Sequence, residues 1–351
     1  RERIQRDWSL QPGQPFTQSG WDGAKSQGLR QLQATRYPTA SIANSRAEID
    51  ADANQAKLDV TYAPGPPYRF GALRVQGSTR YDPDGARRIA RLPEGADYSE
   101  AQLLDAQQRL ASSGYYDAVF LTIDTQDGVD PQAAPVIAQV REAPLQKAVF
   151  GVGISTDSGP RLTLDHIHNR LPGIGWRAVS KLSVDRKNKL ASTEWTALPG
   201  EDGWRWFTGA QLQRETTGSY EVNSTQLRGG RNKSTDHIDR SYFLQYDTSA
   251  NQGTDPPPSS AAISANYGWT GRYFNNNTAP TRGYGIAAEV GVGTTLRPER
   301  DPFVRTRLRW QSFIATGRVD MGEGIRRSSR VALRAEGGAV FARNGADIPA
   351  N

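Results

Sequence analysis

The sequence predicts two small α+β modules followed by an antiparallel β-barrel of the kind that spans a membrane, with the barrel incomplete in this chain. A pattern near the start of the 351-residue chain recurs after about 80 residues, which indicates repeated modules. Helical periodicity ends after Pro144, and eleven segments of about ten alternating residues follow. No apolar run approaches the roughly 18 residues of a membrane helix, but a membrane strand needs only about 9 to 11.

Composition and charge exclude several kinds of chemistry. The chain has no Cys, which rules out disulfides, Cys-ligated zinc, iron–sulfur clusters and thiol nucleophiles. Lys and Arg number 43 against 37 Asp and Glu, and the excess lies after residue 145, where 27 basic residues face 19 acidic ones. These charges are scattered through strand-like segments without a continuous basic run. We therefore expect no nucleic-acid partner.

The repeated pattern is L-x-x-G-x-x-aromatic-[ST]-x-x-x-apolar. Its five positions are Leu10, Gly13, Phe16, Thr17 and Trp21 in the first copy and Leu92, Gly95, Tyr98, Ser99 and Leu103 in the second. The glycines permit a turn, and Thr17 and Ser99 stand where a helix N-cap belongs. A helix should follow each of them.

The second copy predicts the order β-α-α-β-β. Its expected elements are a strand at Phe70–Gln76, a helix at Pro83–Ala90, a second helix that ends before Gly114, and strands at Ala118–Thr125 and Pro135–Glu142. The first copy shows only a helix near Ser19–Ala34 and strands at Ala40–Ile49 and Ala56–Ala63. We therefore expect modules at residues 1–68, with the first strand missing, and 69–145, and barrel strands at 146–351.

The second half predicts a strand meander. The expected strands are Ala148–Thr156, Arg161–Asn169, Trp176–Asp185, Leu190–Leu198, Trp204–Thr216, Ser219–Gly229, His237–Thr248, Ala261–Phe274, Gly283–Thr295, Phe303–Thr316 and Arg330–Phe341. A soluble sandwich would bury one face of each sheet, whereas a single closed sheet around a polar lumen accommodates the polar alternate positions directly. Trp and Tyr gather near strand ends, as at a lipid interface. The connections are expected to alternate between short, as at Arg186–Lys189, and long, as at Asn251–Ser260.

Several motifs point to a known superfamily. The module order and the G-Y-Y-D-A step at Gly114–Ala118 resemble the POTRA (polypeptide-transport-associated) domain. The segments V-F-G-V-G-I-S-T-D-S-G-P-R-L at Val149–Leu162 and N-R-L-P-G-I-G-W at Asn169–Trp176 are similar to the first barrel hairpin of TamA-like proteins. On these motifs the chain resembles a TamA-like member of the outer-membrane assembly superfamily that includes BamA and TamA.

The resemblance implies a noncovalent function without cofactor, metal or catalytic side chain. POTRA domains in the periplasm would receive unfolded outer-membrane or autotransporter clients, and the barrel would help them into the outer membrane at a lateral seam. A TamB-type partner anchored in the inner membrane is also implied. The family has sixteen strands and a V-R-G-Y motif on a lumen loop, and neither is complete here. We therefore expect further domains upstream and further strands downstream.

The candidate site is the first barrel strand, with Phe150, Gly151, Val152, Gly153 and Ile154 as the seam. The two glycines weaken strand pairing because they add backbone freedom and no cross-strand side chain. The three apolar residues alternate on the opposite face and could face lipid. The glycines could instead relieve crowding where the strand bends.

Pro144 marks the junction between POTRA module and barrel in this interpretation. It could couple the orientation of the POTRA module to the barrel. Alternatively, Pro144 only ends a strand.

Two alternatives remain open. A two-partner secretion transporter shares POTRA domains and a barrel but exports one dedicated client. A barrel hydrolase would need a Ser, a His and an orienting residue, and His166 and His168 share one strand face. Adjacent Asp165 points to the other face, which argues against a joint site.

Overall fold

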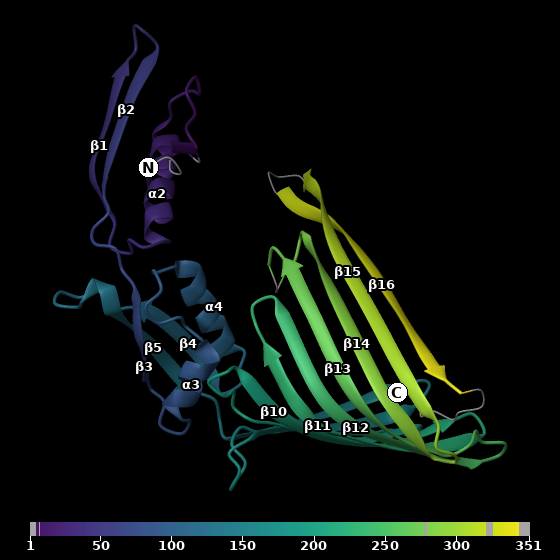
Figure 1. Cartoon of the computed structure of the whole chain (residues 1–351). Coiled ribbons are helices and arrows are strands. Elements are labelled where there is room, and N and C mark those ends of the chain that lie inside the picture. Colours follow the sequence, from purple (N-terminus) through teal and green to yellow (C-terminus); the bar gives the residue numbers. More distant parts are fainter. Residues whose placement is uncertain (1–4, 7, 277–278, 321–325, 344–351) are drawn as a thin grey trace. The chain divides into compact units, whose positions relative to one another are not determined.

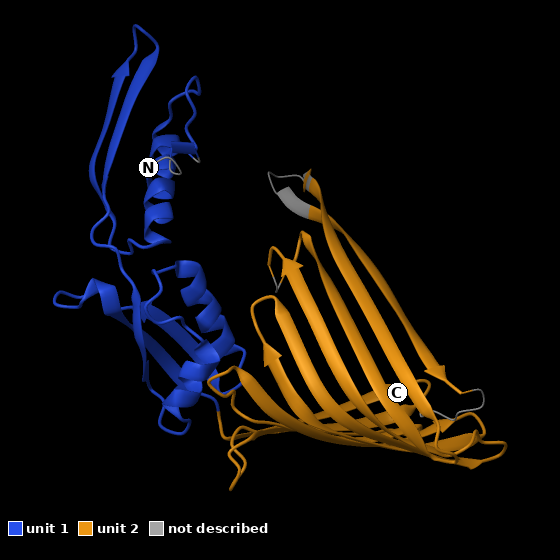
Figure 2. Cartoon of the chain, viewed as in Figure 1, with its two compact units in different colours: residues 1–143 blue, residues 144–351 orange. Residues whose placement is uncertain are grey.

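The computed structural model describes residues 5–6, 8–276, 279–320 and 326–343. The chain divides into two compact units, Arg1–Ala143 and Pro144–Asn351 (Figure 2). Unit 1 contains all the helices labelled in Figure 1, and unit 2 consists of strands. No helix in the described ranges is both long and apolar enough to cross a membrane.

The first module of unit 1 has one helix and a two-stranded sheet. Helix α2 (Gln18–Gln33) begins after Thr17, whose hydroxyl accepts a hydrogen bond from the Gly20 amide at 3.1 Å, as the N-cap pattern predicts. Strands β1 (Ser41–Asp50) and β2 (Gln55–Ala63) pair antiparallel. The expected helix and both strands are confirmed, and no third strand of the described chain joins this sheet.

The second module has the β-α-α-β-β order that the sequence predicts. Its elements are β3 (Phe70–Gln76), α3 (Pro83–Ala90), α4 (Glu100–Ala111), β4 (Tyr116–Ile123), the 3-10 turn η1 (Pro131–Ala133) and β5 (Ala134–Glu142). Strand β5 lies in the middle, parallel to β3 and antiparallel to β4. Phe70, Leu110 and Val136 form the buried centre. Ser99 precedes α4 at the N-cap position, but its side chain makes no capping bond.

Unit 2 is one antiparallel sheet of eleven strands in sequence order, as predicted. The strands are β6 (Gln146–Ser155), β7 (Gly159–His168), β8 (Arg177–Val184), β9 (Asn188–Thr196), β10 (Trp204–Thr217), β11 (Tyr220–Ser234), β12 (Ile238–Gly253), β13 (Ser260–Phe274), β14 (Gly283–Arg297), β15 (Pro302–Asp320) and β16 (Arg326–Ala342). Figure 1 shows this sheet curving into an open trough. Strands β6 and β16 form its two edges, so the barrel is not closed.

The register separates an apolar face of the sheet from a polar face. The pairing places the following residues on the apolar face: Phe150, Leu164, Leu182, Ala191, Leu212, Leu244, Ala265, Val292 and Leu308. The polar face carries Gln213, Gln226, Asp247, Asn266, Arg307 and Glu336. Successive strands therefore keep the same alternation across the whole sheet.

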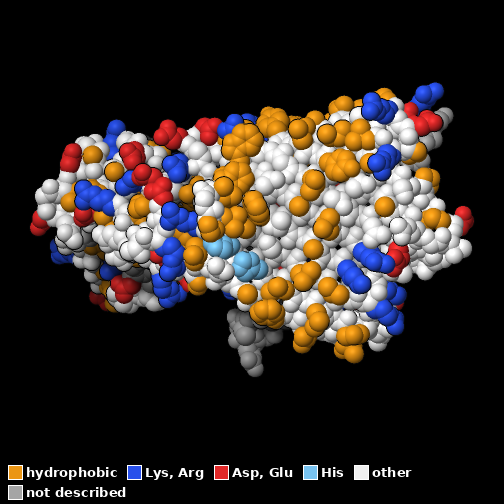
Figure 3. Space-filling view, turned by 90° about the horizontal axis from the view of Figure 1, so that it is seen from below, with side chains coloured by type: hydrophobic (Ala, Val, Ile, Leu, Met, Phe, Trp, Pro, Cys, Tyr) orange, Lys and Arg blue, Asp and Glu red, His pale blue; other side chains and the backbone are white. Residues whose placement is uncertain are grey.

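The apolar face is exposed rather than covered by protein. Leu212 is 56% exposed, Leu244 60% and Leu308 55%. All eleven strands belong to the same sheet, so the described chain supplies no second layer that could pack against this face as in a sandwich. Figure 3 shows hydrophobic side chains spread over the sheet, with charged groups mostly towards its margins.

The connections from β6 to β11 alternate in length, as predicted: residues 156–158, 185–187 and 218–219 form the short ones, and residues 169–176 and 197–203 the long ones. The loop predicted as a long example, after β12, lies on the side of the short connections. In an antiparallel meander, alternate connections share an edge of the sheet, and residues 185–187 and 254–259 both lie at the edge opposite the start of β6. The loop after β12 is also shorter than expected. Asn251 and Gln252 pair with β11 and extend the strand to Gly253.

Candidate functional site at the first edge of the sheet

Strand β6 is an edge strand. It pairs with β7 from Gln146–His168 to Ser155–Gly159, and no other described strand lies beside it. The backbone groups on its other side therefore have no strand partner, and such an edge can pair with another chain. The sequence-predicted seam residues all lie on this strand.

The seam side chains alternate as predicted. Phe150, Val152 and Ile154 lie on the apolar face and are 77%, 86% and 88% exposed. Gly151 and Gly153 lie on the other face. A Cβ at Gly151 would come within 2.4 Å of the Thr163 hydroxyl oxygen, whereas a Cβ at Gly153 would meet nothing within 4 Å. Crowding therefore explains a glycine at Gly151 but not at Gly153.

The strands next to the β6 edge are shorter than those in the rest of the sheet. Strands β6 to β9 contain 10, 10, 8 and 9 residues, whereas β10 to β16 contain 14 to 19. At about 3.3 Å per residue, β8 reaches only about 26 Å even without tilt. The apolar band narrows towards the free strand.

On each side of the junction, the chain is held by hydrogen bonds within its own unit. The Ala143 carbonyl accepts from the Arg80 guanidinium at 2.9 Å and from the Tyr81 hydroxyl at 3.0 Å. The Pro144 carbonyl accepts from the Asn169 side-chain amide at 2.9 Å, and the Leu145 carbonyl accepts from the Asn169 backbone amide at 2.8 Å. Pro144 thus lies just before β6. Asn169 opens the N-R-L-P-G motif, but the motif alone does not show this bond.

Glu142, at the end of β5, organises the loop before α3. Its Oε1 accepts from the amides of Thr79, Arg80 and Tyr81 at 2.8, 2.6 and 2.9 Å and from the Ser78 hydroxyl at 3.1 Å. Burial raises the pKa of this carboxyl, but the hydrogen bonds together outweigh burial and hold its pKa below the ordinary 4.5. No local sequence pattern marks Glu142, because its partners lie about sixty positions away in the chain.

Asp185, in the turn between β8 and β9, also organises a loop through backbone hydrogen bonds. Its side chain is 2% exposed, and Oδ1 accepts from the amides of Asn188 at 2.7 Å and Lys187 at 2.9 Å. Its other oxygen accepts from the Arg161 guanidinium at 3.0 Å. The bond from Asn188, followed by the others, lowers the pKa of Asp185. This carboxylate ties the β8–β9 turn to β7.

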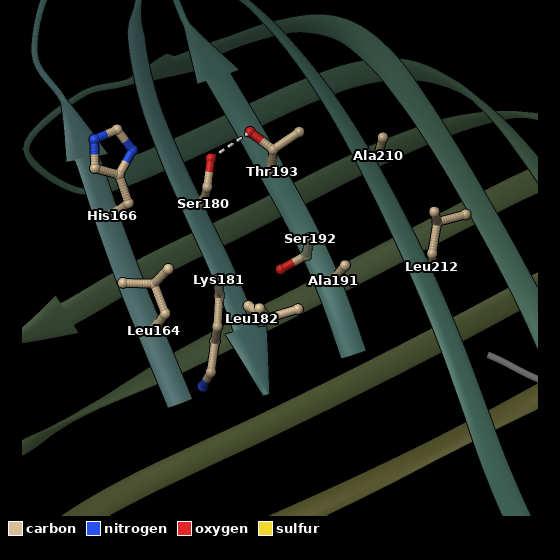
Figure 4. A pocket seen from close by; sticks show the side chains of 10 residues that line it. All are labelled: Leu164, His166, Ser180, Lys181, Leu182, Ala191, Ser192, Thr193, Ala210 and Leu212. Carbon is tan, nitrogen blue, oxygen red and sulfur yellow. Dashed lines mark hydrogen bonds between the residues drawn. The ribbon is translucent and has the colours of Figure 1, made fainter. Parts of the chain in front are cut away.

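One member of the histidine pair, His166, borders a shallow hollow on the apolar face (Figure 4). The hollow has a volume of about 310 Å³, and His166, Ser180 and Thr193 line it together with apolar residues. The two hydroxyls bond each other at 2.9 Å. The rings of His166 and His168 lie 6.4 Å apart, and Asp165 is on the opposite face, in register with Lys181. No cluster of three or more potential metal ligands occurs in the described part of the chain.

Comparisons with known proteins show which families and structures this chain is similar to. Residues 68–143 match the family model "POTRA: Surface antigen variable number repeat". BamA from Haemophilus ducreyi lacking POTRA domains 1–3 is 16% identical, with a TM-score of 0.64 over 97% of this chain and 68% of that structure. CdiB from Acinetobacter baumannii is 13% identical, with a TM-score of 0.47 over 98% of this chain and 65% of that one.

A shorter structure, Haemophilus influenzae BamA POTRA3-5, is 21% identical, with a TM-score of 0.33 over 40% of this chain and 54% of that structure. Of these three structures, the Haemophilus ducreyi BamA structure alone has a TM-score above 0.5, and it supports the assignment of the fold. The family model matches the second module alone. The chain therefore combines a POTRA module at residues 68–143 with an eleven-stranded antiparallel sheet that has the fold of the BamA barrel.

Proposed function

We propose that this protein is an outer-membrane assembly factor that helps client β-barrels into the bilayer at the β6 edge. The observation that carries the proposal is the exposed apolar face of a sheet with the fold of the BamA barrel, in which β6 is the first strand. An apolar face of eleven strands needs hydrocarbon around it. The POTRA module would then lie in the periplasm.

When the seam between β6 and the final strand of the complete barrel opens, the exposed β6 edge supplies the driving force for strand addition. In hydrocarbon, each backbone N–H or C=O without a partner costs several kcal/mol, so an unpaired edge is strongly unfavourable there. An incoming client strand removes this cost by pairing with β6. Gly153 adds backbone freedom to β6 without a packing reason, which favours opening of the seam.

The short strands favour the same place for insertion. Strand β8 reaches only about 26 Å, less than the roughly 30 Å of a hydrocarbon core. The bilayer next to short strands becomes thinner, at a cost of fractions of a kcal/mol for each Å by which the hydrocarbon core exceeds the strand span. A thinner bilayer beside the seam lowers the barrier for a client that enters there.

A narrower assignment rests on the first hairpin. The motifs at Val149–Leu162 and Asn169–Trp176 favour a TamA-like protein, with autotransporter clients and a TamB-type partner in the inner membrane. The fold comparison supports the superfamily architecture and does not distinguish among its members. Clients and partner are part of the proposal.

The test is a seam that can be locked. The chain has no native Cys, and the space at Gly153 accepts a cysteine side chain. A Gly153→Cys variant is joined by a disulfide to a cysteine in the final strand of the complete barrel, and client assembly into vesicles is measured. The control lock joins Ser224→Cys to Ser249→Cys, which are in register on β11 and β12.

We expect the seam lock to block assembly and reduction to restore it, whereas the control lock should have no effect. Unchanged assembly with the seam locked contradicts the proposal.

A second candidate is export of one dedicated client through the barrel. The polar face favours it, because Arg305, Arg307 and Arg309 stand on alternate positions of β15 and would line a lumen. Export through a lumen does not need an open seam. Export of the client by the locked protein would therefore support the second candidate.

A further inference from the structure

A basic and aromatic cluster lies on the apolar face at the start of β10, the end of β11 and the start of β12. These strand ends are on the side of the sheet where β6 begins. We define the Arg231 cluster as Trp204, Trp206, Arg231, Lys233 and Arg240. Arg231 is in register with Trp206 on β10, and Lys233 is in register with Trp204 on β10 and Arg240 on β12. All five residues therefore share the apolar face.

Arg231 is held between two indole rings. Its guanidinium carbon lies 5.6 Å from the ring centre of Trp204 and 5.2 Å from that of Trp206. One terminal nitrogen donates to Asp202 at 3.2 Å, but the buried Nε has no hydrogen-bond partner. Neither Lys233 nor Arg240 has a hydrogen-bond or ion-pair partner among the described residues. Three cations thus face one carboxylate.

An apolar groove leads away from Arg231, whose strand neighbours Lys233 and Arg240 lie outside the groove lining. Its volume is about 780 Å³, and its lining includes Trp206, Arg231, Tyr242, Leu244, Tyr267, Val290 and Val292. Gly229, on the apolar face between Leu227 and Arg231, leaves the groove open because it has no side chain. The groove therefore has the Arg231 guanidinium in its lining and mostly apolar side chains along its length.

We propose that this groove binds one glycerophospholipid, with an acyl chain in the groove and the phosphate at Arg231, Lys233 and Arg240. The assignment rests on the proposed function, in which the apolar face contacts lipid. Charge complementarity selects an anionic head, since charge-assisted hydrogen bonds to phosphate are strong and the cations have few protein partners. The indole rings belong at the level of lipid headgroups, and long basic side chains reach the same level.

The experiment uses the complete protein in detergent, with phosphatidylglycerol as the probe and native mass spectrometry as the readout. The charge variant is Arg231→Gln with Lys233→Gln and Arg240→Gln. The groove variant is Gly229→Leu, whose Cβ meets only ordinary contacts, the nearest at 3.7 Å. The matched control is Arg214→Gln, which removes a cation from the same face at the opposite edge.

We expect the charge variant and the groove variant each to weaken lipid retention about tenfold or more, and the control to retain wild-type binding. Diacylglycerol, which lacks the phosphate, should bind at least tenfold more weakly than phosphatidylglycerol. Equal retention by all variants would mean a nonspecific belt and would overturn the proposal. Displacement of the lipid by millimolar inorganic phosphate would reveal a free-phosphate site and overturn it too.

Two further readouts separate this proposal from the proposed function. Each variant is examined for heat-modifiable migration and for client assembly blocked by the seam lock. If both persist while lipid retention is unchanged, only the lipid site fails. If the native protein itself shows neither, the proposed function fails.

Discussion

Leu212→Arg measures what surrounds the apolar face. Leu212 lies near the middle of β10, is 56% exposed and is in register with Ala191 on β9 and Thr225 on β11. The next residue, Gln213, lies on the polar face and bonds the Glu215 carboxylate at 3.3 Å. An arginine at either position keeps the same strand, depth and charge change, so the pair differs only in the face.

Water and hydrocarbon around Leu212 predict different changes in the free energy of unfolding for Leu212→Arg. If water covers the apolar face, replacing an exposed leucine changes the free energy of unfolding by no more than about 0.5 kcal/mol. If hydrocarbon covers it, an arginine near the bilayer midplane costs about 2–4 kcal/mol. That cost is a factor of roughly 30 to 900 in the folding equilibrium. Gln213→Arg should stay near wild type, because its guanidinium meets Glu215.

The assay is urea titration of the protein folded into phospholipid vesicles, followed by Trp fluorescence. We expect Leu212→Arg to lower the free energy of unfolding by about 2–4 kcal/mol relative to Gln213→Arg. A difference below about 0.5 kcal/mol would refute the reasoning, because it would show that the exposed leucine does not contact hydrocarbon.

Three further substitutions test local features. Glu142→Gln should speed amide exchange at residues 79–81 about tenfold, since each bond to the charged carboxylate, worth roughly 1.5–3 kcal/mol, is replaced by a bond to a neutral oxygen worth roughly 0.5–1.5 kcal/mol. Because the pKa of Glu142 is lowered on folding, its contribution is present above about pH 4.5 and is lost as the pH falls through the folded-state value; the variant should lack this acid-dependent step. Asp185→Asn should destabilise the β8–β9 turn, seen as faster exchange at Lys187 and Asn188, with no change at residues 79–81. Gly153→Val should fold normally, since its side chain meets nothing, yet slow client assembly several-fold; unchanged assembly would remove Gly153 from the opening mechanism.

The alternation of side chains made most of unit 2 predictable from sequence. Eleven strands were expected and eleven form, because the side chains of a strand with one apolar and one polar face must alternate. Strand ends were less predictable. Polar residues such as Asn251 and Gln252 suggest a loop, yet they extend β12 because β11 offers them backbone partners.

The candidate site was only partly predictable. The sequence places Phe150, Val152 and Ile154 on one face of a first strand, but edge status depends on which strands pair, a property of the whole sheet. Carboxylates that accept several backbone hydrogen bonds are even harder to predict from the sequence. Glu142 serves amides about sixty residues upstream, and no local pattern marks such a long-range contact.

The central claim is that hydrocarbon covers the apolar face of the sheet. Because the chain lacks Cys, single cysteines at each position from Ser241 to Tyr246 on β12 can carry a nitroxide label without background. Collision rates with oxygen, which concentrates in lipid, and with a water-soluble nickel chelate are measured in vesicles. The account predicts oxygen preference at Tyr242, Leu244 and Tyr246 and nickel preference at Ser241, Phe243 and Gln245. Equal nickel access on both faces, or the absence of a two-residue period, would contradict it.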